Sequence, residues 1–167
     1  HQFEFTAKHL AEAQEWQQNF RKALRDGLKI DRRTLPENLI GKQISSIDKG
    51  TYTEEKHVLQ IDGVETPLYL LTPKSEPPYP ALVAFHGHGK GVHHILGNYD
   101  DPELAELHKS NDENFAQRFA EDGYMVCAIE QQGFGERVTN QQSEPPSANS
   151  CRHLAFEYMM HNRTLLG

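Results

Sequence analysis

A glycine-rich turn with two histidines follows a short apolar run near the middle of the chain. The run is Ala81–Phe85, and His86-Gly87-His88-Gly89 comes directly after it. Glycines permit positive φ and let a substrate oxygen approach backbone N–H groups closely. Such donors, directed at one point, stabilise the oxyanion that develops in acyl transfer, by about 3–4 kcal/mol for each donor. The turn therefore predicts an anion-binding site built from backbone amides.

Two other glycine motifs do not fit this segment. A dinucleotide-binding fingerprint needs G-x-G-x-x-G, but the sixth position is Val92 when counted from Gly87, and His94 when counted from Gly89. A P-loop needs a serine or threonine after its Gly-Lys pair, and this chain has Gly91 there. The sequence thus argues against both kinds of nucleotide-phosphate loop.

A histidine-based metal site is a further interpretation of the same segment. His86, His88, His93 and His94 lie close together in the sequence, and His-x-His can ligate zinc. No cysteine or carboxylate in the segment completes a compact tetrahedral set. We therefore predict no metal and no cofactor, expect His93 and His94 only to line a polar loop, and keep a His-rich metal-binding module as an alternative.

The apolar runs around the turn indicate an α/β fold. Asp62-Gly63 separates the runs Val58–Ile61 and Leu68–Leu71, which predicts a two-residue hairpin turn between antiparallel strands. Ala81–Phe85 and Tyr124–Ile129 lack polar alternation, so we expect both to be strands covered on both faces. Together they predict a hairpin that leads into parallel strands.

The segment between the last two strands should form the crossover of a right-handed βαβ unit. A long loop is expected at 89–110, and Asp101 and Pro102 suit the N-cap and first position of a short helix within it. Ser110–Glu113 has the spacing of a capping box and predicts the start of the main crossover helix. Gly123 should end that helix.

The two ends of the chain are predicted to be helical. Residues 7–28 carry apolar side chains at three- and four-residue spacing, which indicates an amphipathic helix with a docking face. Another helix is expected from about Ser150, with Leu154 and Leu165 in a core-facing stripe. We divide the chain into a helical segment at 1–40 and the first half of a larger domain at 41–167.

Three segments resemble the α/β-hydrolase superfamily, most closely its dienelactone hydrolase and acetyl xylan esterase-like branch. Pro78–Gly89 looks like the third strand and oxyanion turn. Tyr124–Ile129 followed by Gly133–Arg137 is similar to the fourth strand and the Gly-x-Gly turn after it. Arg163–Gly167 resembles the helix that leads to the nucleophile strand. The resemblance covers about residues 56–167.

The resemblance implies an α/β fold that is the N-terminal portion of an α/β-hydrolase domain. In it, an antiparallel hairpin leads into a mostly parallel sheet flanked by helices, and the amphipathic helix precedes the hairpin. It implies that the backbone N–H of His88 is an oxyanion donor with Gly89 as its neighbour, and that His86 orients the loop. Tyr99, Asp100 and Arg137 are candidates for substrate contact, with capping and a structural ion pair as the alternatives.

The nucleophile of this family lies in G-x-S-x-G after the fifth strand. None of the serines of this chain has those glycines around it, and Cys151 lacks them too; the serines are Ser45, Ser46, Ser75, Ser110, Ser143, Ser147 and Ser150. The resemblance therefore puts the whole Ser-Asp-His triad after Gly167. We expect this chain, which begins with His1 rather than Met, to be a processed, trimmed or excerpted product and to be inactive alone.

Composition limits the partners and the compartment. The chain has 17 basic and 24 acidic residues, a formal net charge of −7, and no basic cluster, so we expect no nucleic acid. Its apolar runs are too short for a bilayer, so we expect no membrane partner. Cys127 and Cys151 cannot form a disulfide framework, which favours a reducing, cytoplasmic location.

These observations predict a serine-type carboxylic-ester hydrolase that acts on a small-molecule ester and whose oxyanion turn lies in this chain. A non-catalytic binding protein on a hydrolase scaffold is the alternative from a different class, beside the metal-binding module. The sequence leaves the substrate and the oligomeric state open.

Overall fold

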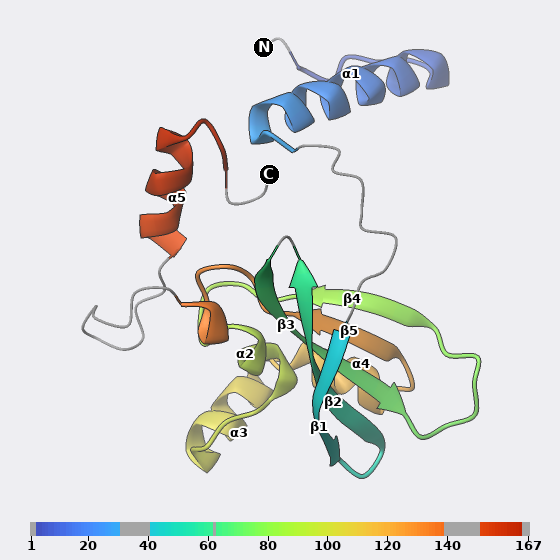
Figure 1. The fold of residues 1–167 in the computed structure, drawn as a ribbon. Helices are drawn as coiled ribbons and strands as arrows, with labels where there is room; N and C mark the ends of the chain where they lie inside the picture. The colour runs from blue at the N-terminus through green and yellow to red at the C-terminus, as the bar shows by residue number, and fades with distance from the viewer. Residues whose placement is uncertain (1–2, 31–40, 62, 139–150, 165–167) are drawn as a thin grey trace. The chain divides into compact units, whose positions relative to one another are not determined.

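The computed structural model of the 167-residue chain describes residues 3–30, 41–61, 63–138 and 151–164 (Figure 1). The chain divides into two compact units. The first contains residues 1–35 and 152–167, and the second contains residues 36–151. The division that the sequence predicts at residue 40 stays a prediction.

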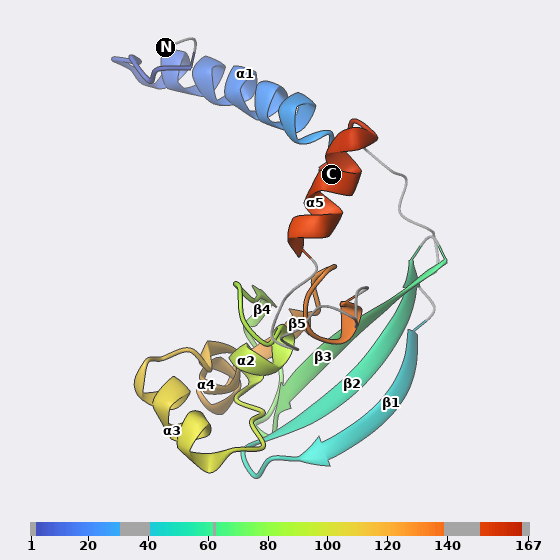
Figure 2. The ribbon, with the colours of Figure 1, turned by 90° about the vertical axis from the view of Figure 1, so that its left-hand side faces the viewer.

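A mixed five-stranded sheet forms the second unit, in the order β1-β2-β3-β5-β4 (Figure 2). The three antiparallel pairs are β1 with β2, β2 with β3, and β3 with β5, whereas β4 and β5 are parallel. The predicted α/β class is therefore confirmed. The strands are β1 (Gly41–Asp48), β2 (Tyr52–Ile61), β3 (Val64–Pro73), β4 (Ala81–Phe85) and β5 (Met125–Ile129).

The hairpin between β2 and β3 forms where the sequence predicts it. Ile61 lies opposite Val64, so two residues connect the strands. Gly63 has φ +77°, which a residue with a Cβ rarely adopts and which the tight turn requires. Asp62 lies outside the described residues. This turn directs β3 back across the sheet to pair with β5.

Helices occupy the crossover differently from the prediction. The expected long loop contains α2 (Val92–Leu96) and α3 (Pro102–Ser110), and the main helix α4 spans Phe115–Glu121. Ser110 therefore ends α3 and does not start α4. Asp101 accepts hydrogen bonds from the backbone of Glu103 and Leu104, so the cap predicted at Asp101 is confirmed and its helix runs on through Ser110. The hydroxyl of Ser110 donates back to that helix, to the carbonyl of Leu107.

The core lies on one face of the sheet only. Leu71, Ala84 and Val126 from the strands pack with apolar residues of α2 and α4. On the other face of β4, Val83 is 57% exposed and Phe85 60% exposed. Among the described residues, the expectation of cover on both faces is therefore wrong for β4, whereas the second face of β5 is half-buried. The reason is that both crossover helices that join this core pack on the same side, and β4 is an edge strand.

The first unit contains α1 (Leu10–Leu28) and most of α5 (Cys151–Met160). The predicted stripe on α1 is half-buried at Trp16 and Phe20, whose rings stack with centroids 5.0 Å apart. Of the α5 stripe, Leu154 is buried, and Leu165 lies outside the described residues. Among the described helices, none combines the length and apolar character that crossing a membrane requires.

Candidate functional site

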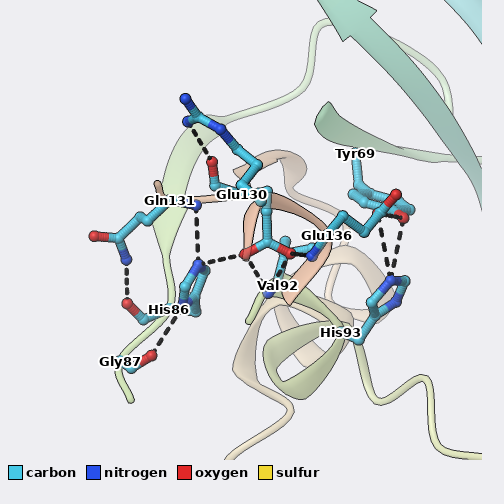
Figure 3. A network of polar contacts seen from close by, with 9 residues as sticks. Tyr69, His86, Gly87, Val92, His93, Glu130, Gln131 and Glu136 are labelled. Carbon is cyan, nitrogen blue, oxygen red and sulfur yellow. Dashed lines mark hydrogen bonds and ion pairs between the residues drawn. The ribbon is translucent and has the colours of Figure 1, made fainter. Parts of the chain in front are cut away.

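The parallel register of β4 and β5 brings His86 and Glu130 together. Phe85 and Ile129 are partners in that register, so the next residue of each strand leaves the same edge of the sheet side by side. His86 Nε2 lies 2.8 Å from Glu130 Oε1 (Figure 3). The two side chains are 1% and 0% exposed. A buried histidine–carboxylate pair thus lies at the start of the glycine-rich turn.

Further hydrogen bonds fix His86 in place. Its Nδ1 lies 2.8 Å from the Gly87 carbonyl, and because a carbonyl only accepts, Nδ1 carries the proton. Nε2 lies 3.0 Å from the backbone N–H of Gln131, and the amide of Gln131 donates to the His86 carbonyl. This side chain thus ties the turn after β4 to the loop after β5, and the loop-orienting role of His86 stays a prediction.

The protonation of His86 depends on opposing effects. Burial disfavours the imidazolium form and by itself lowers the pKa of His86. The hydrogen bond and negative charge of Glu130, together with the Gly87 carbonyl, favour that form and outweigh burial. The pKa of His86 is therefore raised above its ordinary value of 6.5. In the protonated form, the second proton sits on Nε2 and is donated to Glu130, and Nε2 then no longer accepts from the Gln131 backbone N–H.

Glu130 is also an acceptor for the backbone of two loops. The N–H of Val92 lies 3.2 Å from Oε1, and the N–H of Glu136 lies 3.3 Å from Oε2. Gly91 and Gly135 surround the carboxylate. A Cβ at Gly91 would meet Oε1 at 2.6 Å, and a Cβ at Gly135 would meet Oε2 at 2.2 Å. These two glycines are thus required for close approach to a buried carboxylate.

The turn itself presents backbone donors at the carboxyl edge of the parallel pair. No described residue accepts a hydrogen bond from the backbone N–H of His88 or Gly89. The His88 ring packs edge-on against Phe134, with centroids 5.2 Å apart. Its Nε2 lies 3.6 Å from the Cys151 sulfur, a proximity that the sequence does not predict. Open α/β sheets bind ligands at this edge.

A second polar cluster lies beside α2, at Tyr69, His93 and Glu136 (Figure 3). The Tyr69 hydroxyl donates to Glu136 Oε1 at 2.5 Å, and Lys56 forms an ion pair with the other oxygen. The hydrogen bond from His93 lowers the pKa of Glu136 most; burial opposes it, and Lys56 and Tyr69 help to bring that pKa to about 2. His93 and His94 lie in α2, so the expectation that they line a loop is wrong, and His93 contacts an ionised carboxylate.

The candidates for substrate contact separate into two places. Tyr99 and Asp100 line a pocket of about 590 Å³. Neither His86 nor the His88–Gly89 segment lines this pocket. Arg137 donates to the carbonyl of Glu130 at 3.1 Å and so supports the buried pair. The other residues that line the pocket are Ser45, Ile47, Glu54, Lys56, Tyr69, Lys90, His93 and Asn98.

The histidines of the turn do not gather as one metal set. His86 and His93 each face a different glutamate, Glu130 and Glu136. His94 instead lies with His108 and Glu113, two residues from outside the segment. The sequence argument did not consider Glu113, because it compared only near neighbours in the chain.

Glu130 is the main site residue that sequence reasoning missed. An acidic residue that directly follows a buried strand and precedes Gly133-Phe134-Gly135 was the available signal. In an open sheet, that position faces the ligand-binding edge. A charged residue there needs partners, and His86 at the corresponding position of the neighbouring strand is one.

Comparison with known proteins places this architecture among esterase structures. No family model matches the sequence, and no curated protein matches it. A protein from Bacteroides fragilis NCTC 9343 that is assigned as an acetyl xylan esterase matches 98% of this chain, with a TM-score of 0.78 and 18% identity. A methylesterase matches 98% of it, with a TM-score of 0.61 and 18% identity. The chain spans 42% and 35% of their lengths. It therefore has the fold of the N-terminal part of these proteins.

Proposed function

We propose that this chain is the oxyanion-binding half of a carboxylic-ester hydrolase. The backbone N–H of His88, with that of Gly89 beside it, would donate to the oxyanion that forms when a nucleophile attacks the ester carbonyl. His86 and Glu130 would act as positioning residues, because they hold the turn and do not reach the substrate. The observation that carries the proposal is the buried His86–Glu130 pair, which fixes a turn whose amides have no acceptor among the described residues.

Rigidity of the donors is what this chemistry requires. Preorganised amides stabilise developing charge because they need no reorientation at the moment of reaction. The turn is anchored by the side-chain amide of Gln131, which donates to the His86 carbonyl, and by the Val92 and Glu136 backbones on Glu130. These bonds join the loops after β4 and β5, so the donors would move only with both strands.

The nucleophile, acid and base would come from residues that this sequence does not contain. The chain spans less than half of the two esterase structures that it matches. Within the described residues, β4 pairs only with β5 and exposes Val83 and Phe85. A strand that carries a G-x-S-x-G nucleophile would pair with β4 and bring its serine to the same edge as His88.

A small-molecule ester is the substrate class that this reaction needs. Tyr99 and Asp100 would contact the part of the substrate that lies away from the reacting carbonyl, because neither His88 nor Gly89 lines their pocket. Its lining includes lysines and a buried glutamate, so we expect that part to be polar. Arg137 would act through Glu130, whose carbonyl it contacts, and not on the substrate.

Removal of one backbone donor tests the proposal. The longer protein that contains this chain should hydrolyse p-nitrophenyl acetate and be labelled by a fluorophosphonate probe. In His88→Pro the imide nitrogen carries no proton, so kcat should fall about 100–1,000-fold, the loss observed when one oxyanion donor is removed. The matched control is His88→Ala, which keeps the N–H and should retain kcat within a few-fold.

Each outcome has a defined meaning. Equal activity of the proline and alanine variants would contradict a donor role for the His88 backbone. No hydrolysis and no probe labelling by the wild-type longer protein would favour the non-catalytic binding protein. An open reading frame that stops at Gly167 would do so as well.

A further inference from the structure

Three metal-ligating side chains from separate elements meet outside the His86–Glu130 site. His94 belongs to α2, His108 to α3, and Glu113 to the segment before α4. His94 Nε2 lies 2.9 Å from Glu113 Oε2, and His108 Nδ1 contacts the same oxygen. The three ligand atoms all lie within 4.8 Å of one another.

Local structure places the three ligands together. The Asp101 cap begins α3 at Pro102, so that His108 falls in its last turn. Asp112 has φ +58° and reverses the chain there. The backbone N–H of Glu113 then donates to the carbonyl of His108 at 3.0 Å. This bond keeps Glu113 next to His108, and both residues contact His94.

Tyr99 holds both imidazole rings in orientation. Its ring stacks on His108 at 4.6 Å with an interplanar angle of 8°, and lies edge-on to His94 at 5.9 Å. Its hydroxyl donates to the His94 carbonyl at 3.2 Å. On another side, a Cβ at Gly89 would lie 3.3 Å from His94 Nδ1, so the glycine leaves the room that the His94 ring needs. Outer contacts of this kind orient the ligands of metal sites.

We propose that His94, His108 and Glu113 form a binding site for a divalent transition metal, with Zn²⁺ as the best match. Two imidazoles and one carboxylate are a ligand set that Zn²⁺ uses when a fourth position is left for water. The histidine side chains are 21% exposed and that of Glu113 is 36% exposed, so water can reach the fourth position.

The spacing of the ligand atoms must adjust when the ion enters. With bonds of about 2.0–2.1 Å, tetrahedral ligands lie roughly 3.3 Å apart. Glu113 Oε2 lies nearer than that to both nitrogens, so the carboxylate would move back as the ion enters. Without metal, one carboxylate oxygen accepts hydrogen bonds from both imidazoles, and this is the state that the ion would replace.

Metal titration of the 167-residue chain tests the site directly. After treatment with a chelator and dialysis, the protein should bind one Zn²⁺ in isothermal titration calorimetry. Co²⁺ should give the visible absorption of a four-coordinate site. His108→Ala and Glu113→Gln should each weaken Zn²⁺ binding by at least about 10–100-fold, since loss of even an outer-shell partner has that effect.

A neighbouring histidine provides the matched control. His93→Ala removes an imidazole that faces Glu136 instead, so its Zn²⁺ affinity should equal that of the wild type. Far-UV circular dichroism checks that the variants fold. Should His108→Ala unfold, Glu113→Gln decides alone, because glutamine keeps the volume and an acceptor oxygen. Absence of stoichiometric binding, or an equal loss in the His93 variant and the ligand variants, would overturn the proposal.

Discussion

Replacement of Glu130 by alanine is the strongest test of how the site is held together. Glu130 is fully buried and accepts from the Val92 and Glu136 backbones while its Oε1 faces His86 Nε2. Alanine would remove every one of these acceptor atoms at once. It would also leave a polar void between Gly91 and Gly135, the glycines that surround the carboxylate.

The expected loss follows from the groups that are left behind. A buried donor without a partner costs about 1–3 kcal/mol, and loss of one member of a buried ion pair costs about 3–5 kcal/mol. Water that enters the void would satisfy part of this demand. We therefore expect Glu130→Ala to lower the free energy of unfolding by about 3–5 kcal/mol. Glu130→Gln keeps the volume and one acceptor oxygen, so its loss should be nearer to about 1–3 kcal/mol.

Urea unfolding followed by far-UV circular dichroism measures these differences from midpoints and slopes. The matched control is Glu76→Ala, because Glu76 is exposed and has no partner among the described residues. Its effect should stay within about 0.5 kcal/mol. A loss below about 1 kcal/mol for Glu130→Ala would refute the view that this carboxylate organises both loops.

Three further predictions address single features. Gly135→Ala should lower the free energy of unfolding by at least about 1–3 kcal/mol, because its Cβ would meet Glu130 at 2.2 Å at a φ of +42°. The control Gly87→Ala has no atom within 4 Å of its Cβ and should be near neutral by urea unfolding. Because the folded pKa of His86 is raised, its contribution to stability is complete below pH 6.5 and is lost as the pH rises through that raised value. Urea midpoints between pH 6 and 9 should therefore fall more for the wild type than for His86→Gln. Parallel curves for the two proteins would contradict this prediction. Asp101→Ala should cost about 1 kcal/mol through the lost α3 cap, and Asp100→Ala, which removes no cap, should leave the thermal midpoint close to that of the wild type.

Local signals in the sequence were sufficient for part of the fold. Asp62-Gly63 predicts the β2–β3 hairpin because a two-residue turn depends only on its own residues. Asp101-Pro102 predicts a helix start for the same reason. The predicted start at Ser110 was wrong because two adjacent capping patterns compete. The helix already begun at Pro102 uses Ser110 as its last residue.

The site required information that no local pattern contains. The position of Glu130 next to His86 follows from the register Phe85 with Ile129, and parallel register is a long-range property. Likewise, Glu113 reaches His94 only because the chain reverses at Asp112. Glycine spacing correctly marked an unusual loop. It could not show that Gly91 is needed for space around a carboxylate from another strand.

The apolar sequence of β4 is typical of a buried strand, yet two of its side chains are exposed, and this difference has a physical explanation. Val83 and Phe85, which are 57% and 60% exposed, would each gain about 1–2 kcal/mol if they were fully buried. Their exposure on an edge strand creates a template for another strand. A sequence selected for an edge usually carries charges or proline there. Ala81–Phe85 carries neither, so its composition fits an interior strand with a neighbour on each side. The proposed nucleophile strand would be that neighbour, and it would bring a serine beside the turn that His86 and Glu130 hold in place.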